Sequence, residues 1–268
     1  MEAIVRLTAF FGIFTILAFL EIIAPRRELS VSKAWRWFTN LSLTGLDIVI
    51  VRLFFGTATI QTALFAREHG WGLLNYLHLP SWLAFLTAII FLDFMIYIQH
   101  VISHALPIFW RLHMVHHTDL DFDVTTAARF HPIEIIVSLI FKLGLVVVIG
   151  ATPAAVLVFE IILNGSAQFN HSNIKLTDGL DRILRWSIIT PDFHRVHHSV
   201  KVAETNSNYG FFLPYWDYLC GTYRAQPALS HTDMIIGLKE YRDKGELSLP
   251  SLVVLPFVAL TGQFSRRD

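Results

Sequence analysis

The sequence predicts an all-α integral membrane protein, a bundle of about four transmembrane helices with a helical cap that holds a histidine-rich site for two metals. The first observation is composition: 54% of the 268 residues are hydrophobic and only 16% are charged, whereas soluble domains usually have about a quarter of charged residues. The second is a series of five apolar runs, two of which form a hairpin. The third is a set of clustered histidines.

The first apolar run covers residues 4 to 24 and contains two charged residues, Arg6 and Glu21. It is longer than the apolar part of a signal peptide, and no small-residue cleavage site follows, so we expect a retained span. Four basic residues then share one short segment: Arg26, Arg27, Lys33 and Arg36. By the positive-inside rule this segment is cytoplasmic.

We expect a second span over about residues 40 to 65, with Asp47 and Arg52 snorkelling or paired with each other. A short outer loop, residues 67 to 80, holds His69 and His78. A third span starts near Ser81 and ends at the first histidine cluster.

Two further apolar runs, from Ile133 to about Gly150 and from Pro153 to about Phe169, predict a transmembrane hairpin with arms near the lower length limit for a span. A hairpin returns the chain to its starting side. His131 before it and His171 after it therefore lie on the side of the histidine clusters.

The remaining chain is more polar. The sequence Thr190-Pro191-Asp192 predicts a helix start, because it combines a cap residue, a proline at the first position and an acid in the first turn. Near the C-terminus, LPSLVVLPFVALTG is too short to span a membrane and is interrupted by Pro256, so we expect it at the interface or packed on the bundle.

Several protein classes are excluded. A formal net charge of zero gives no nucleic-acid surface. The single cysteine, Cys220, excludes an internal disulfide framework and a cysteine-ligated iron–sulfur cluster. There is no HExxH, GxGxxG or P-loop pattern, so a zincin protease and a fused nucleotide-binding site are also excluded.

Eight histidines form three clusters: His100-x3-His104, His113-x2-His116-His117 and His194-x2-His197-His198. Positions i, i+3 and i+4 share one helix face, so each cluster directs its imidazoles the same way. A lone histidine on an apolar face is usually a core residue, but two copies of HxxHH favour metal binding. Eight nitrogens exceed the three or four protein ligands of one zinc site, which favours two metals.

HVISH, HMVHH and HRVHH resemble, in this order, the three histidine boxes of the fatty acid hydroxylase and sterol desaturase superfamily of membrane di-iron oxygenases. RFHPIE, NHSN and NYGFFLPYWDYLCGTY are similar to the same family, and together these motifs cover roughly residues 80 to 225. The resemblance implies two iron ions, with zinc as a substitute on purification, O2 as oxidant and a lipid substrate from the bilayer.

The resemblance also implies the metal ligands: His100, His104, His113, His116, His117, His171, His194, His197 and His198. His131 stays open between a ligand, a residue behind the ligands and a helix cap. Metal-bound imidazoles usually donate their second N–H to a carboxylate or carbonyl. Candidates for that role are Asp93, Asp119, Glu134 and Asp192. We expect Asp119, Asp121 and Asp123 to be a solvated face or histidine partners.

We therefore expect one membrane-embedded domain over residues 1–268, with its core at 80–225 and, at 226–268, a polar tail containing the short apolar segment. It would hydroxylate a fatty acyl chain, sterol, glyceryl ether or carotenoid-like lipid. Desaturation is the nearest alternative, and a non-redox metal- or haem-binding membrane protein is a further one. Haem is disfavoured because the histidines cluster at the ends of spans.

The expected electron donor is a separate reductase, ferredoxin or cytochrome b5-like protein on the cytoplasmic side. Basic residues that could receive an acidic partner there, or contact lipid headgroups, are Arg111, Arg129, Arg195 and Lys201. The expected location is the bacterial inner membrane, or the endoplasmic reticulum of a eukaryote.

Overall fold

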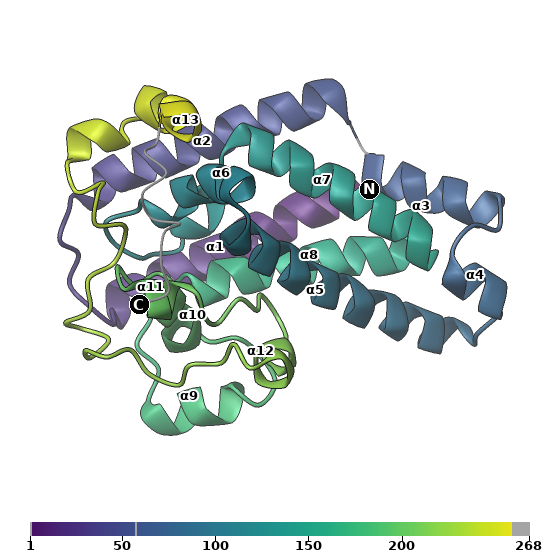
Figure 1. Cartoon of the computed structure of the whole chain (residues 1–268). Coiled ribbons are helices and arrows are strands. Elements are labelled where there is room, and N and C mark those ends of the chain that lie inside the picture. The colour runs from purple at the N-terminus through teal and green to yellow at the C-terminus, as the bar shows by residue number, and fades with distance from the viewer. Residues whose placement is uncertain (1, 57, 259–268) are drawn as a thin grey trace.

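The computed structural model describes residues 2–56 and 58–258, and every regular element in them is a helix. The elongated bundle in Figure 1 contains α1 (Glu2–Ile23), α2 (Lys33–Phe54), α3 (Ala58–Glu68), α4 (Leu73–Leu77), α5 (Ser81–Ala105), α7 (Pro132–Ile149) and α8 (Pro153–Asn170). The cap at one end contains α6 (Pro107–His117), η1 (Thr126–Ala128), α9 (Asp178–Leu184), α10 (Pro191–His197), α11 (Val202–Thr205), α12 (Tyr215–Cys220), η2 (Lys244–Leu247) and α13 (Leu249–Val258).

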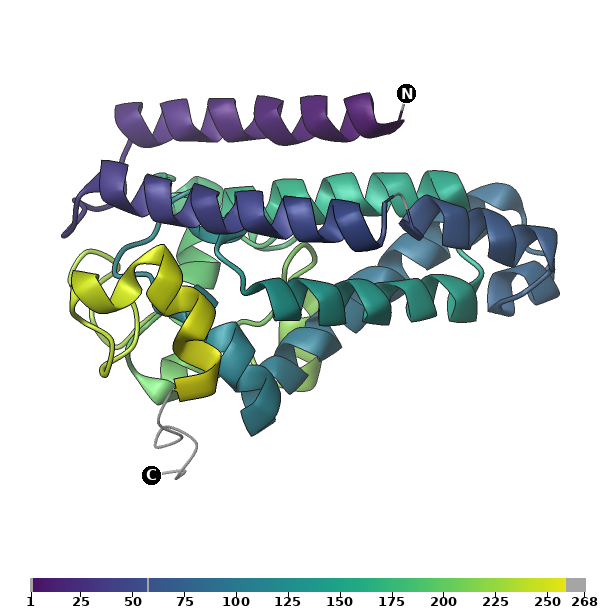
Figure 2. The same ribbon diagram turned by 90° about the horizontal axis from the view of Figure 1, so that it is seen from above.

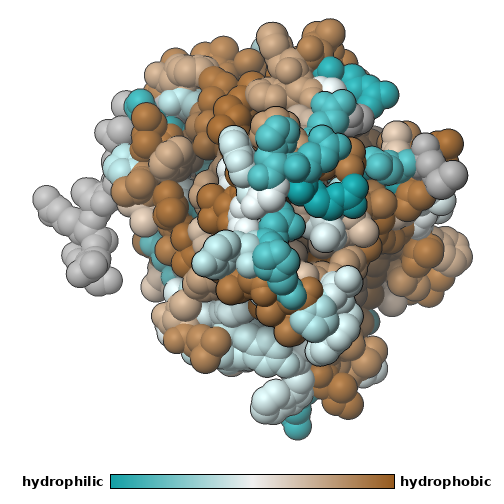
Figure 3. All heavy atoms as spheres, turned by 90° about the vertical axis from the view of Figure 1, so that its right-hand side faces the viewer, coloured by the Kyte–Doolittle hydropathy of each residue, from teal (hydrophilic) through white to brown (hydrophobic). Residues whose placement is uncertain are grey.

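Four stretches are long and apolar enough to cross a membrane: Glu2–Ile23, Lys33–Leu77, Ser81–Ala105 and Pro132–Ile149. The chain is thus a multi-pass membrane protein, and the predicted all-α membrane bundle is confirmed. Figure 3 looks at the end that carries α3 and α4, where polar residues gather in the middle and apolar residues surround them. The apolar rim is what a bundle exposes to lipid.

The second span differs from the sequence prediction at both ends. α2 begins at Lys33, about two turns earlier than expected, with the Ser32 hydroxyl accepting a hydrogen bond from Trp35 N. It ends at Phe54, next to Gly56 in the left-handed region with φ of 55°. The early start is explained by polar residues of the first turns, which hydropathy assigns to a loop but which lie buried against the cap.

The predicted hairpin is present as α7 and α8, but of its two arms only α7 is among the four stretches long and apolar enough to cross a membrane. Gly150 ends α7 with φ of 74°, and the Thr152 hydroxyl caps α8, whose first residue is Pro153. The backbone of Gly72 packs so closely here that a Cβ on it would lie 2.2 Å from Gly150 N. The turn of the hairpin is therefore fixed against the segment that begins α4.

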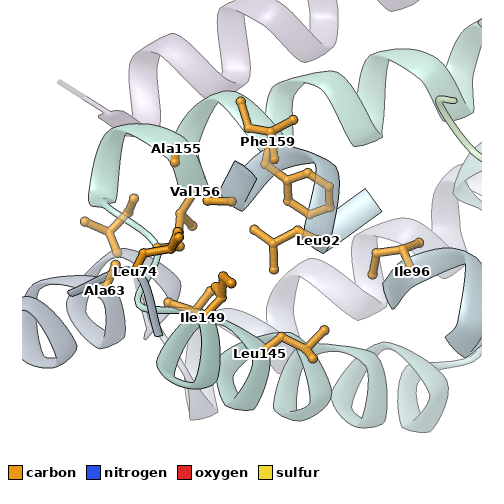
Figure 4. Packing of buried hydrophobic residues seen from close by; sticks show 14 residues of the cluster. Ala63, Leu74, Leu92, Ile96, Leu145, Ile149, Ala155, Val156 and Phe159 are labelled. Atoms are coloured by element: carbon orange, nitrogen blue, oxygen red, sulfur yellow. The ribbon is translucent and has the colours of Figure 1, made fainter. Parts of the chain in front are cut away.

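Apolar side chains of α3, α5, α7 and α8 form the core of the bundle. Leu92, Val146, Val156 and Phe159 are among its fully buried members. Figure 4 shows Leu92 and Phe159 facing the same interior space. This core aligns the end of α5 with the end of α8, and both ends lead into the cap.

α1 forms an outer layer, visible along one edge of Figure 2. It runs beside α8, where Gly165 leaves room for Ile13: a Cβ there would lie 2.9 Å from Ile13 Cδ1. Near its start Arg6 forms an ion pair with the buried Glu160, which Lys142 Nζ approaches to 3.3 Å. Glu160 is thus paired, as the cost of burying ions requires. Asp47, by contrast, is buried with its Oδ1 lacking a hydrogen-bond partner among the described residues, and the predicted pair with Arg52 is not seen there.

The acidic stretch after the second histidine box is buried, so its expected role as a solvated face is wrong. Arg36, fully buried in α2, donates to both carboxylate oxygens of Asp119 at 2.6 and 2.8 Å and to Asp123 at 2.6 Å. Asp121 accepts hydrogen bonds from the backbone N–H groups of Ser30 and Val31 at 2.8 and 2.9 Å. These ion pairs and hydrogen bonds hold the loop after α6 against the start of α2.

The C-terminal apolar segment forms α13, which packs on α6 and α2. Of the two predicted placements, at the membrane interface or packed on other helices, the structure shows the second. Leu252 and Leu255 lie in one cluster with Leu43 and Met114. Pro256 is inside the helix, and residues 259–262 of the predicted segment lie outside the described residues.

We predict that Arg36→Met lowers the free energy of unfolding by about 3–5 kcal/mol, because it leaves two buried carboxylates without their cation. Denaturant titration in mixed micelles measures this loss. Arg52→Met is the matched control, since Arg52 is on the same helix with an exposed side chain, and should change the free energy by about 0.5 kcal/mol or less. Equal losses in both variants would contradict the assigned role of Arg36.

His231 provides a test of pH dependence. Burial lowers its pKa from 6.5 to about 3, although Asp192 lies 3.7 Å away, because that carboxylate already pairs with Arg26 and Arg195. In the unfolded chain the His231 imidazole takes up a proton once the pH falls below 6.5. In the folded chain it stays neutral until the pH approaches about 3. Stability from neutral His231 is therefore complete above pH 6.5 and is lost as pH falls.

We predict that His231→Asn reduces the pH dependence of unfolding by one proton, about 1.4 kcal/mol per pH unit between roughly pH 6 and pH 4. Denaturant titrations of parent and variant at several pH values give the difference. Parallel curves would show that His231 is protonated in the folded protein.

Candidate metal centre

The three histidine clusters reach the cap from three helices. His100 and His104 lie on the last turns of α5, and His113, His116 and His117 end α6. His194 and His197 lie on α10, and His198 is the residue after it. α10 starts as predicted, with Thr190 Oγ1 accepting from Phe193 N at 3.3 Å and Pro191 in the first position.

The structure brings nine histidines together in two groups. The first is His100, His104, His113, His117 and His197, and the second is His116, His171, His194 and His198. Within each group one ring nitrogen per residue lies within 4.8 Å of the others. All nine side chains are buried.

In the first group, protein oxygens hold four of the rings by Nδ1. His100 Nδ1 donates to Tyr209 O and His197 Nδ1 to Ser207 O, both at 2.7 Å. His113 Nδ1 donates to Glu134 Oε1 at 2.6 Å, and His104 Nδ1 to Asn206 Oδ1 at 3.3 Å. A neutral imidazole that donates through Nδ1 has its lone pair on Nε2. These four Nε2 atoms are thus acceptors or ligands.

The second group is centred on His171. Its Nδ1 donates to Ala167 O at 2.7 Å, and its Nε2 lies 3.1 Å from His116 Nε2 and 3.2 Å from both His194 Nε2 and His198 Nε2. His116 also stacks on Phe130 with ring centroids 4.5 Å apart. The sequence pattern placed His171 on the correct side, and the structure places its ring within this group.

The nitrogens in both groups fit metal coordination better than mutual hydrogen bonding. Nitrogens bound about 2.1 Å from one metal lie roughly 3.0–3.4 Å apart in octahedral or tetrahedral geometry, and the separations here are 3.1–3.2 Å. In addition, Nε2 of His104, His117 and His197 is buried and finds no hydrogen-bond partner among the described residues. Burying such atoms is costly without a partner.

Burial favours the neutral form of five of these imidazoles. Burial lowers the pKa of His171 to about 3. Burial, together with neighbouring imidazoles, lowers the pKa values of His116, His117, His194 and His198 well below 6.5. Neutral imidazole is the form that binds metals. The two groups could therefore each hold a metal ion.

His131 lies outside both groups and caps a helix. Its Nδ1 accepts a hydrogen bond from Ile133 N at 3.1 Å at the start of α7, and its Nε2 donates to Val253 O at 3.1 Å. Both ring nitrogens are thus used by backbone groups. Of the alternatives left open by the sequence, the structure shows the helix cap.

Of the four carboxylates expected behind the ligands, only Glu134 contacts a histidine of the two groups. Asp93 accepts from Trp216 Nε1 at 2.7 Å, and Asp119 pairs with Arg36. Asp192 pairs with Arg26 and Arg195, and the histidine that it contacts is His231. These three carboxylates support the cap instead, because arginine or tryptophan side chains occupy them.

Two of the four basic residues expected at a docking face are buried. Arg129 donates to Val115 O, Asn40 Oδ1 and Thr118 Oγ1 at 2.8–2.9 Å. Arg195 is fully buried beside Asp192. Burial lowers the pKa of both guanidinium groups to about 10. They are therefore unavailable to a partner, whereas Lys201 is exposed.

Sequence reasoning missed the backbone carbonyls of Ser207 and Tyr209, the Asn206 side chain, and Glu21. Glu21 Oε1 accepts from Val124 N at 2.7 Å and from Asn173 N at 2.8 Å, so it ties α1 to the turn after His171. Carbonyl oxygens give no residue-type signal. Glu21 stood out only as a charge inside an apolar run.

Comparison with known proteins gives relatives of three kinds. The chain is 32% identical over 196 residues to an ornithine lipid hydroxylase, OlsE, of Rhizobium tropici, covering 70% of this chain and 54% of the relative. It is 29% identical over 205 residues to an alkylglycerol monooxygenase of Xenopus tropicalis, covering 73% and 44%. It is 26% identical over 201 residues to a very-long-chain aldehyde decarbonylase of Oryza sativa subsp. indica, covering 72% and 30%.

The chain spans about half or less of the length of these relatives. No solved structure matches it. The sequence profile of the fatty acid hydroxylase family matches residues 85–222, which contain all nine histidines of the two groups. With half of its length matched by this profile, the chain belongs to the fatty acid hydroxylase family.

Proposed function

We propose that this protein is a multi-pass membrane di-iron oxygenase that uses O2 and external electrons to hydroxylate a C–H bond of a lipid. The observation that carries the proposal is the burial of nine imidazoles in two adjacent groups at the end of an apolar bundle. Membership of the family and relatives named as hydroxylase and monooxygenase support it.

The proposed ligands of the two irons are the nine histidines of the two groups, with five for one ion and four for the other. Such a nitrogen shell is unlike the carboxylate-rich di-iron sites of soluble helical bundles. Bound iron would supply the oxidant for an unactivated C–H bond, which side chains alone lack. Zinc binds nitrogen sites more tightly than ferrous iron and would be a substitute on purification.

The chain's own contribution is to hold the ligand rings. We propose that Glu134 fixes the ring and tautomer of His113 and increases its basicity, as carboxylates behind metal-bound histidines do. The carbonyls of Ser207 and Tyr209 would do the same for His197 and His100. His131 has no proposed metal role.

The substrate, donor and location follow by inference. An apolar bundle favours a lipid that enters from the bilayer, and relatives named for ornithine lipid and alkylglycerol indicate polar lipids. The loop with Arg26 and Arg27 favours the cytoplasmic side for the cap. A reductase, ferredoxin or cytochrome b5-like donor would approach from there, and a single membrane-embedded domain would contain the site.

We predict that Glu134→Ala lowers metal affinity by about 10–100-fold, and Glu134→Gln by about tenfold, because the glutamine keeps an acceptor for His113 but loses the charge. Competition with a chromophoric chelator measures affinity for Zn2+ and Fe2+. Glu68→Gln, an exposed carboxylate at the opposite end of the bundle, is the control. Unchanged affinity in both Glu134 variants would show that the contact only stabilises α7.

We predict about two metal ions per chain in protein expressed with ample iron, and a loss of metal in His113→Ala and His171→Ala, which belong to different groups. His131→Ala is the matched control and should keep the parent's metal content. Elemental analysis of the purified protein in detergent measures this. With O2 and a reductase, the parent should then add one oxygen atom to a membrane lipid.

One metal or none, insensitive to both substitutions, would contradict the di-iron proposal. Full metal content with a product that lacks hydrogen instead of gaining oxygen would replace hydroxylation by desaturation.

A further inference from the structure

A group of large apolar side chains is exposed on the cap, outside the predicted spans. They come from α9, the residues after it and α12: Leu180, Ile183, Trp186, Tyr215, Tyr218 and Leu219. Ile183, Trp186 and Leu219 are 67%, 72% and 77% exposed. We call this set the α9–α12 face.

Hydrogen bonds join the two parts of the α9–α12 face. The Tyr215 hydroxyl donates to Trp186 O at 2.7 Å, and the Tyr218 hydroxyl donates to Arg185 O at 3.1 Å. Arg185 is itself held by Asp181 at 2.6 Å. Both tyrosine hydroxyls thus have partners inside the protein, and their rings can meet an apolar environment without loss of a hydrogen bond.

The face is continuous with the membrane-spanning part of the chain. Trp216, the second residue of α12, packs on Phe94 of α5 with ring centroids 4.9 Å apart and donates to Asp93. Asp93 lies twelve residues before the end of α5 at Ala105, roughly 18 Å along the helix. α12 therefore lies beside the span and not beyond its end, as Figure 1 also shows.

The composition of the face matches a membrane interface. Tryptophan and tyrosine concentrate at the boundary between hydrocarbon and headgroups. Lys175 and Arg182, near α9, are exposed and basic, which favours contact with lipid phosphates. Contiguous exposed apolar side chains usually mark an interaction surface. Lying beside a span, this one faces lipid before any other partner.

We propose that the α9–α12 face inserts into the interfacial layer of the bilayer, so that the cap is bound to the membrane on a second side. α10, with the third histidine box, lies between α9 and α12 in the sequence. Insertion fixes that box relative to the bilayer. The proposal concerns membrane contact alone and does not depend on metal content or turnover.

Cys220, at the end of α12, is exposed and is the single cysteine of the sequence. A thiol-reactive label can therefore be attached there without any substitution. A nitroxide label on Cys220, in full-length protein in phosphatidylcholine nanodiscs with one copy per disc, reports collisions with O2 and with a water-soluble nickel chelate. We expect the ratio of O2 to nickel accessibility to be several-fold higher than at a control label on Lys201→Cys in a Cys220→Ser background. Lys201 is an exposed residue before α11 and does not belong to the set that defines the face.

Three results would overturn the proposal. A nickel-accessible label with a ratio equal to the control would place the face in water. Protection from both reagents that appears only with two copies per disc would assign the face to a second copy of the chain. Protection that appears only on addition of a soluble electron carrier would assign it to that carrier.

A second measurement separates insertion from local unfolding. In protein labelled at Cys220, the double substitution Ile183→Ser and Trp186→Ser should lower the ratio toward the aqueous value, whereas Ile235→Ser, an exposed apolar residue of the tail outside the face, should not. Both variants should keep the parent's helical circular dichroism. A ratio unchanged by the double substitution would count against insertion.

Discussion

The fold depends on the burial of nine imidazoles where three distant parts of the chain meet. Burial, together with the neighbouring His171, lowers the pKa values of His116 and His194. Protonation of any one would place a cation in an interior that cannot solvate it. The surroundings must therefore orient neutral rings, and in the first group they do so by accepting hydrogen bonds from Nδ1.

The charged residues of the cap also help to position the histidines, because they hold α6 and the loop after it. α6 carries three of the nine histidines and is followed by the loop that Arg36 holds through Asp119 and Asp123. Arg129 closes the other side by donating to Val115 O, inside α6 itself. The early start of α2 follows from this arrangement, because its first turns have to reach the loop. The helix that begins the second span thus also supports the loop after the histidines of α6.

The sequence predicted the parts that follow from local periodicity. Box spacing placed each set of imidazoles on one helix face, and hydropathy found the hairpin that brings His171 to the cap. The same hydropathy could not separate His171 from His131, because both flank the hairpin on one side. Their difference is local: His131 precedes Pro132 and becomes a helix cap, whereas His171 ends α8 with its ring anchored on Ala167 O.

Long-range pairing was the part that could not be predicted. Asp119 and Arg36 are 83 residues apart, and nothing in either local sequence identifies the partner, so composition favoured solvent for the acids and a docking face for Arg129 and Arg195. Backbone acceptors such as Ser207 O cannot be predicted from the sequence either, since a residue of any type has a carbonyl oxygen.

The two groups differ in what holds their rings before a metal is bound. In the first group four rings are fixed through Nδ1 by Glu134, Asn206 and two carbonyls. In the second only His171 has such a contact, while Nδ1 of His116, His194 and His198 is buried without a partner among the described residues. Ligand orientation is thus built into the first group. In the second it depends on ring packing, with Phe130 against His116 and Phe122 against His171 and His198. Since aromatic packing restrains a ring less strictly than a hydrogen bond in its plane, the second group has more freedom to adjust its geometry.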